Sequence, residues 1–124
     1  MPHTTLEYTS TIAEQPDFQA FWEQLHRFLS EECPFNLKDI KSRAYRCDEF
    51  RMAGGSRDLA FVHLTILVLE GRDPAVLAKA GNGALDLLKV HFARSLETLQ
   101  ADLTVEVRDM RRDGYFKATS VKSL

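Results

Sequence analysis

The sequence predicts one α/β domain over residues 1–124, in which a four-stranded sheet carries two helices on one face only. Three observations support this fold class. The expected elements follow the order strand, helix, strand, strand, helix, strand, which divides into two strand-helix-strand halves. The chain of 124 residues has the length of one domain, and its 44% hydrophobic content can fill one core. Residues 58–70 are too apolar for a strand with one wet face, so they belong at the centre of the sheet.

The first half begins with a strand at His3–Tyr8, where polar and apolar residues alternate. From Pro16 onward, apolar side chains recur at three- and four-residue spacing, which predicts an amphipathic helix that ends near Pro34. Residues 40–52 are expected to form the second strand. Residues 53–56, with two consecutive glycines, are expected to form a hairpin turn.

The second half continues with the apolar strand and a second helix. Asp73 can cap this helix, and Pro74 suits its first position. The helical period of apolar residues continues to about Gln100. Gly81 and Gly83 weaken the helix but permit close packing against a neighbour.

The C-terminal part alternates at Leu103–Arg108, which predicts the last strand. Residues 111–114 are expected to form a turn and residues 115–121 a short tail element. If both helices cover one face, alternate positions of 59–69 expose apolar side chains on the other. Large apolar patches are uncommon on monomers, so we expect a homo-oligomer.

Composition excludes several classes of protein. The formal net charge of −2 provides no basic excess for nucleic acid. The start, MPHTTLEYTS, lacks the features of a signal peptide, and no segment approaches the roughly 18 apolar residues of a membrane span. We therefore expect a cytoplasmic protein with no membrane or nucleic-acid partner.

Cofactor and metal motifs are also missing from the sequence. Cys33 and Cys47 form no CxxC and have no histidine pair nearby, so we interpret them as reduced structural residues. The sequence has no Walker loop, GxGxxG, HExxH or GxSxG. We expect neither a cofactor nor a metal.

Pro2 is the first candidate for catalysis. Met1 before a small residue is normally removed, which would leave the secondary amine of Pro2 as the N-terminus. An α-amine has a reference pKa of about 7.7–8.0, and burial or nearby cations lower it. A neutral amine can act as a general base, and the strand that begins one residue later would hold it in place.

Four cations could accompany this base. Lys41, Arg43 and Arg46 lie on the second expected strand, where Lys41 and Arg43 share one face. Arg72 follows the apolar strand beside a helix start, a common location for anion-binding groups. Arginine can hold a carboxylate through two hydrogen bonds. Each cation taken alone is also compatible with a solvated surface charge.

The remaining titratable groups form no evident set. His63 is interpreted as a hydrogen-bonded core residue, because no serine or cysteine nucleophile signature accompanies it. Asp102, Glu106 and Asp109 do not converge on a strand, so we place them at the surface.

Five collinear segments, which span nearly the whole chain, resemble the 5-carboxymethyl-2-hydroxymuconate isomerase family of the tautomerase superfamily. They are Met1-Pro2-His3, Ile40-Lys41-Ser42-Arg43, Ala60-Phe61-Val62-His63-Leu64-Thr65, Gly71-Arg72 and Phe116-Lys117. The resemblance implies a trimer of two-unit strand-helix-strand subunits, with sites near the subunit contacts. It also implies cofactor-free isomerisation of an anionic dienol in bacterial aromatic (homoprotocatechuate) catabolism.

The resemblance assigns roles residue by residue. Pro2 matches the proline that transfers the proton, and Arg72 matches an arginine that binds substrate carboxylate. Arg43 matches a second arginine, and Phe116 becomes a candidate for substrate contact. Lys41 stands where the family has arginine, and an ammonium lacks the two-pronged fork, so affinity or substrate identity can differ.

Two alternatives remain open at this point. One is a tautomerase of another 2-hydroxydienoate or of a phenylpyruvate-like enol, which the lysine at position 41 would favour. The other is a non-catalytic trimeric binding module of the same fold, which retention of Met1 would favour.

Overall fold

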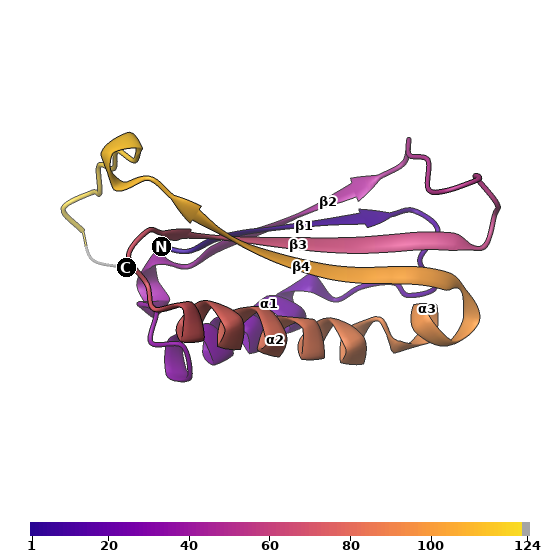
Figure 1. The fold of residues 1–124 in the computed structure, drawn as a ribbon, viewed down its shortest axis with the longest axis horizontal. Helices are drawn as coiled ribbons and strands as arrows, with labels where there is room; N and C mark the ends of the chain where they lie inside the picture. The colour runs from indigo at the N-terminus through magenta and orange to yellow at the C-terminus, as the bar shows by residue number, and fades with distance from the viewer. Residues whose placement is uncertain (123–124) are drawn as a thin grey trace.

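The structure, a computed structural model, describes residues 1–122. The elements in chain order are β1 (His3–Thr9), α1 (Phe18–Glu31), β2 (Lys41–Cys47), β3 (Leu59–Leu69), α2 (Pro74–His91), α3 (Ala93–Thr98) and β4 (Gln100–Met110). The strands form one sheet in the order β2-β1-β3-β4. Both long helices lie against the same face of this sheet (Figure 1). The predicted fold class is therefore confirmed.

The two halves join in the middle of the sheet. β1 pairs with β2 in parallel, β3 pairs with β4 in parallel, and β1 pairs with β3 antiparallel. The predicted hairpin at residues 53–56 is wrong, because β1 lies between β2 and β3. The glycines still reverse the chain, and Gly55 adopts a φ of +83°. The apolar β3 takes the central position beside β1, which leaves β2 at an edge.

The core lies between the sheet and the helices. Alternate residues of β3 are buried, and the matching stripes of α1 and α2 cover them. The largest fully buried side chains include Leu6, Phe21, Leu25, Leu29, Val62, Leu64, Ile66, Val68, Leu88 and Phe92. Burial of this apolar area is the main stabilising term of the fold.

An aspartate side chain caps the N-terminus of each long helix. Asp17 accepts a hydrogen bond from the backbone of Ala20 at 3.0 Å. Asp73 accepts one from the backbone of Ala75 at 2.8 Å, and Pro74 is the first residue of α2, as predicted.

The second helix is shorter than predicted. α2 ends at His91, Phe92 leaves the helical conformation, and α3 follows as a separate turn. The carboxylate of Glu14 accepts hydrogen bonds from the backbone (3.1 Å) and the hydroxyl (2.5 Å) of Ser95, which stabilises the bend. β4 consequently begins at Gln100, earlier than predicted, where its backbone N–H bonds Asp58.

The segment after β4 agrees with the prediction only in its turn. Residues 112–114 form one 3-10 turn where a turn was predicted, but the tail element predicted at residues 115–121 adopts no regular helix or strand. In Figure 1 this yellow segment lies at the same end of the sheet as the N-terminus.

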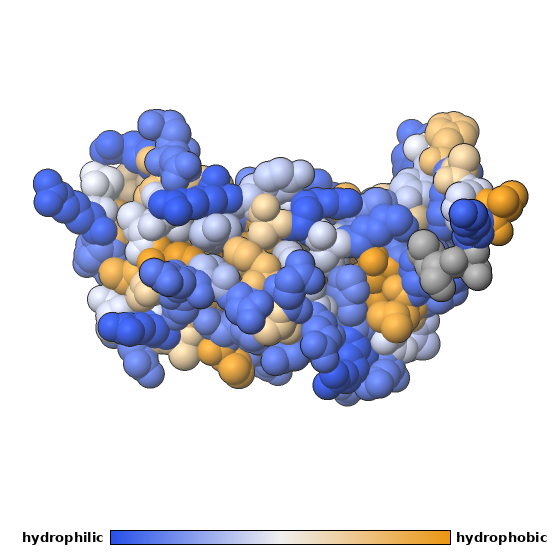
Figure 2. Space-filling model, turned by 180° about the vertical axis from the view of Figure 1, so that it is seen from behind, coloured by the Kyte–Doolittle hydropathy of each residue, from blue (hydrophilic) through white to orange (hydrophobic). Residues whose placement is uncertain are grey.

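The side of the molecule opposite to the view of Figure 1 is mostly polar. On the side seen in Figure 2, hydrophilic residues predominate and the apolar patches are small and separate. No helix within residues 1–122 is long and apolar enough to cross a membrane.

Gly83 provides a first test of the helix packing. A Cβ at this position would overlap the ring of Phe28 on α1, whereas a Cβ at Gly81 would meet Val107 at 3.4 Å. Gly81→Ala should raise the free energy of unfolding by up to about 1 kcal/mol through helix propensity. Gly83→Ala should leave the protein about 1–3 kcal/mol less stable than Gly81→Ala, because the Phe28 ring must move. Urea denaturation of the pair checks this, and equal midpoints would contradict the packing.

Candidate active site

The N-terminus lies in a hollow at one end of the sheet. Pro2 is buried, and its carbonyl accepts a hydrogen bond of 3.1 Å from the backbone N–H of Lys41. The hollow has a volume of about 310 Å³. Its lining comprises Met1, Asn36, Asp39, Leu69, Arg72, Arg112, Tyr115 and Lys117. These residues come from the strand ends, from the loop before β2 and from the segment after β4.

Positive charge dominates this hollow. Arg72, Arg112 and Lys117 line it, and Asp39 is the one carboxylate among its lining residues. Asp39 accepts a hydrogen bond of 3.1 Å from Lys117 Nζ and lies 4.0 Å from the terminal amine of Met1. The ammonium of Lys117 holds the pKa of Asp39 below its ordinary value. The hollow thus suits an anionic ligand.

The environment favours the neutral form of the terminal amine. Burial lowers the pKa of the Met1 amine, and the charges of Lys41, Lys117 and Arg72 lower it further. The carboxylate of Asp39 acts in the opposite direction. The net pKa is below that of an ordinary α-amine, so a larger fraction of this amine is neutral at a given pH than in a free chain terminus.

Arg72 is positioned by the turn after β3. Gly71 adopts a φ of +105°, a conformation that favours glycine, and Asp73 begins the cap of α2. The guanidinium of Arg72 lies 4.5 Å from the centroid of the Phe35 ring. No carboxylate within residues 1–122 pairs with Arg72, so its hydrogen-bond donors are available to a ligand.

Lys41 and Arg43 reach the site in different ways. Lys41 is exposed, donates to the carbonyl of Asp39 at 3.2 Å and lines an adjoining hollow of about 570 Å³. Arg43 instead donates from Nη2 to Nδ1 of His3 at 3.0 Å. Nε2 of His3 lies 2.9 Å from the hydroxyl of Tyr115. Arg43 therefore acts on His3, not on the hollow directly.

Phe116 does not reach the hollow of its own chain. Its side chain is 88% exposed, whereas its neighbours Tyr115 and Lys117 both line the hollow. Arg46, the fourth cation noted in the sequence, lies outside the site. Its Nε forms an ion pair with Oδ1 of Asp48 at 2.9 Å.

His63 is not the core residue that the sequence predicted. It lies on the sheet face without helices, bonds Thr104 through Nδ1 at 2.6 Å and lies 3.6 Å from Glu106. The strand alternation directs position 63 away from the core, which the apolar composition of β3 concealed. Asp102, Glu106 and Asp109 are exposed, as predicted. Cys33, in the loop after α1, and Cys47, at the end of β2, are free thiols.

The face without helices is more polar than expected. β3 contributes Phe61, Leu67 and Leu69, with His63 and Thr65 between them. The partners of Phe61 and Leu67 on the neighbouring strands are polar or charged, whereas Leu69 pairs with Met110. The apolar surface on this face is therefore confined to the two ends of β3.

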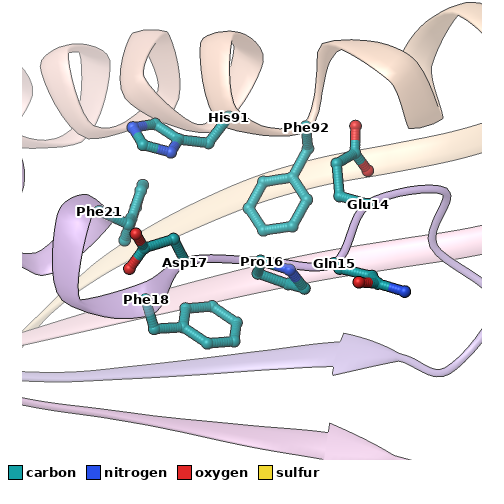
Figure 3. A pocket seen from close by; sticks show the side chains of 8 residues that line it. All are labelled: Glu14, Gln15, Pro16, Asp17, Phe18, Phe21, His91 and Phe92. Atoms are coloured by element: carbon teal, nitrogen blue, oxygen red, sulfur yellow. The ribbon is translucent and has the colours of Figure 1, made fainter.

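A smaller hollow of about 90 Å³, separate from these two, lies between the lead-in to α1 and the end of α2 (Figure 3). Its lining comprises Glu14, Gln15, Pro16, Asp17, Phe18, Phe21, His91 and Phe92. The polar groups there are engaged: Glu14 bonds Ser95, Asp17 caps α1, and His91 lies 2.9 Å from the Gln24 amide oxygen. None of the predicted site residues lies in it, so we assign it a structural role.

Among the polar residues of the site, sequence reasoning did not select Asp39, Arg112, Tyr115 or Lys117. Each lies in a loop or turn, and only the fold brings them to the N-terminus. Within residues 1–122, no group of three His, Cys, Asp or Glu side chains is arranged to hold a metal ion.

Known structures share this fold. A solved structure described as a "Q0 fused 4-OT wild type symmetric trimer" superposes with a TM-score of 0.72 over 96% of this chain and 94% of that chain, at 12% identity. The crystal structure of a 5-carboxymethyl-2-hydroxymuconate isomerase from Deinococcus radiodurans R1 has a TM-score of 0.88 at 30% identity, covering 96% and 90% of the two chains. The fold places the protein in the tautomerase superfamily.

Sequence comparison defines the family within that class. The 5-carboxymethyl-2-hydroxymuconate Delta-isomerase of Escherichia coli is 31% identical over 124 residues, which cover 100% of this chain and 98% of the relative. The sequence model of the 5-carboxymethyl-2-hydroxymuconate isomerase family matches residues 2–124. The chain belongs to this family and is an isomerase.

Proposed function

We propose that this isomerase converts an anionic dienol of the 5-carboxymethyl-2-hydroxymuconate type to the conjugated ketone, with the amine of Pro2 as general base after loss of Met1. The observation that carries the proposal is that the terminal amine of Met1, one residue before Pro2, lies in a cationic hollow where burial and nearby cations lower its pKa. The name of the family supports the choice of substrate. The predicted place in aromatic catabolism follows from that substrate.

The reaction needs no redox partner. The neutral amine takes the proton of the 2-hydroxyl, the enol oxygen becomes a ketone, and a proton is returned to a carbon further along the conjugated system. Arg72 holds a substrate carboxylate, and Lys41 adds positive charge from the adjoining hollow. These fixed cations stabilise the negative charge that develops on the enolate oxygen.

A second candidate substrate follows from Lys41. Its ammonium provides one point of charge where the resemblance implies the two-pronged guanidinium of an arginine. This difference favours another 2-hydroxydienoate or a phenylpyruvate-like enol. A panel of enols would rank the two candidates by kcat/KM.

The assembly we propose is a homotrimer with sites near the subunit contacts. The outward apolar side chains at the two ends of β3 and the exposed Phe116 support a partner surface. We propose that Phe116 contacts the substrate of a neighbouring subunit. Light scattering after gel filtration should give three times the chain mass of 14.1 kDa, and a stable monomer would contradict this assembly.

The activity is tested by the ultraviolet rate of ketonisation of freshly generated 5-carboxymethyl-2-hydroxymuconate. The protein must first be shown by mass spectrometry to lack Met1. Turnover well above the buffer rate supports the proposal. A rate equal to buffer with this substrate, together with turnover of another enol, supports the second candidate.

The carboxylate of Asp39 gives a prediction with a defined sign. This carboxylate raises the pKa of the Met1 amine, and we expect it to act in the same direction on the Pro2 amine that replaces it, so Asp39→Asn should lower that pKa. The active form is the neutral amine, which would then persist to lower pH. We expect the acidic limb of the kcat/KM profile to move to lower pH, and Asp58→Asn, at the far end of β3, to leave it in place. A shift to higher pH would contradict the assignment of the limb to this amine.

A further inference from the structure

Tyr115 lies where two hollows meet. It lines both the hollow that contains the N-terminus and the adjoining hollow beside Lys41. The segment that carries Tyr115 is fixed on each side. Arg112 Nε donates to the carbonyl of Glu70 at 2.9 Å, and Lys117 Nζ donates to Asp39 Oδ1 at 3.1 Å. The phenol is thus held at the wall of the cationic site.

The hydrogen bonds around His3 have only one consistent direction. A guanidinium can only donate, so Nδ1 of His3 must accept the 3.0 Å hydrogen bond from Arg43. The proton of a neutral imidazole is then on Nε2, which donates to the Tyr115 oxygen at 2.9 Å. Burial, with the charges of Arg43 and Lys41, lowers the pKa of His3, which agrees with the neutral ring.

This direction leaves the phenolic proton of Tyr115 unused. The Tyr115 oxygen accepts from His3, and no other side chain within residues 1–122 forms a hydrogen bond with the Tyr115 hydroxyl. An O–H group whose oxygen already accepts a hydrogen bond is a better donor, because hydrogen bonds in a chain polarise one another. The site therefore contains an oriented neutral donor among its charged groups.

We propose that the hydroxyl of Tyr115 donates a hydrogen bond to an oxygen of the anionic substrate, and that His3 and Arg43 are positioning residues that set its direction. The inference rests on the proposed function for the identity of the ligand as an enol carboxylate. Beyond that function, the inference assigns to Tyr115 the recognition of a substrate oxygen at the boundary of the two hollows.

The primary test compares Tyr115→Phe with Tyr45→Phe. Tyr45 is a surface tyrosine on β2 that is 57% exposed and lines neither hollow, so it is a matched control. Loss of one hydrogen bond to a charged ligand should lower kcat/KM for the dienol roughly 10- to 100-fold in Tyr115→Phe. Tyr45→Phe should match the wild type. Equal kcat/KM in all three proteins would overturn the proposal.

Equilibrium binding makes the test independent of catalysis. The probe is adipate, the saturated six-carbon dicarboxylate that cannot ketonise, titrated by calorimetry. Weaker adipate binding by Tyr115→Phe would place the contact at a carboxylate, whereas a loss confined to dienol turnover would place it at the enol oxygen. If the wild type binds adipate but turns over no dienol, the proposed function fails while Tyr115→Phe still decides the inference.

Variants of His3 test whether this residue orients the Tyr115 hydroxyl or only holds the segment around Tyr115 in place. His3→Leu removes the donor to Tyr115 and should reproduce most of the loss in kcat/KM. His3→Gln keeps an N–H near the position of Nε2 and should recover much of it. Hydrogen exchange of residues 111–118 provides the structural readout. A loss of activity that appears only with faster exchange in this segment would overturn the proposal in favour of mere attachment.

Discussion

Blocking the amine of Pro2 should remove most of the catalytic rate. A leucine inserted between Met1 and Pro2 would leave the initiator methionine in place, because the residue after it is no longer small. The nitrogen of Pro2 would then be an amide with no basic lone pair. General base catalysis typically contributes about 10²- to 10⁴-fold, so kcat should fall by about that factor.

Pro2→Ala is the milder companion of this variant. Its methionine is still removed, and the new terminus is a primary amine in the same hollow. This amine can act as a base but lacks the ring that fixes the nitrogen relative to β1. We expect kcat between that of the wild type and that of the blocked protein, measured by the same ultraviolet assay.

The controls concern folding and processing. Pro2 is buried and its carbonyl pairs with Lys41, so an added residue could disturb the start of β1. Circular dichroism, gel filtration and intact mass should accompany each rate. A folded, blocked protein with wild-type kcat would exclude the amine of Pro2 as the base and move attention to other groups of the hollow.

Hydrophobic periodicity was sufficient to predict the architecture, because the apolar pattern of the strands differs clearly from the three- to four-residue pattern of the helices. β3 is apolar on nearly every residue and occupies the centre, and α1 carries its apolar stripe toward the sheet. Strand order was less accessible. Two consecutive glycines indicate a reversal of the chain, but local residues do not say whether β1 will lie between the two strands.

The bend at Phe92 shows how tertiary contacts override a continuous helical pattern. The apolar spacing continues through this position, so the sequence alone predicts one helix. The capping group is Glu14, which is remote in sequence and bonds both the backbone and the hydroxyl of Ser95. No local rule could have identified this partner.

Candidate site residues could be selected from the sequence where they lie next to a predicted strand or helix cap. Pro2 and Arg72 could be selected because one precedes β1 and the other precedes the cap of α2. Asp39 and Tyr115 lie in irregular segments, and their relation to the N-terminus depends on contacts across the whole chain. Arg43 was among the predicted cations, but its partner His3 was not foreseen.

Replacing Arg72 should produce the second large effect, on the binding of substrate carboxylate. Its guanidinium has no carboxylate partner within the described residues and is supported by the Phe35 ring at 4.5 Å. A hydrogen bond to a charged group contributes about 1.5–3 kcal/mol, so Arg72→Ala should lower kcat/KM roughly 10- to 100-fold. Steady-state kinetics with the dienol measures this.

Two further variants decide what Arg72 contributes. Arg72→Lys keeps the charge but not the two-pronged fork, so it should recover only part of kcat/KM if the guanidinium holds the carboxylate through two hydrogen bonds. Arg46→Ala removes an exposed cation outside the hollow and should leave kcat/KM unchanged. Full recovery in Arg72→Lys would show that charge alone is sufficient. In that case the lysine at position 41 would be no obstacle to the same substrate, and the second candidate would lose its main support.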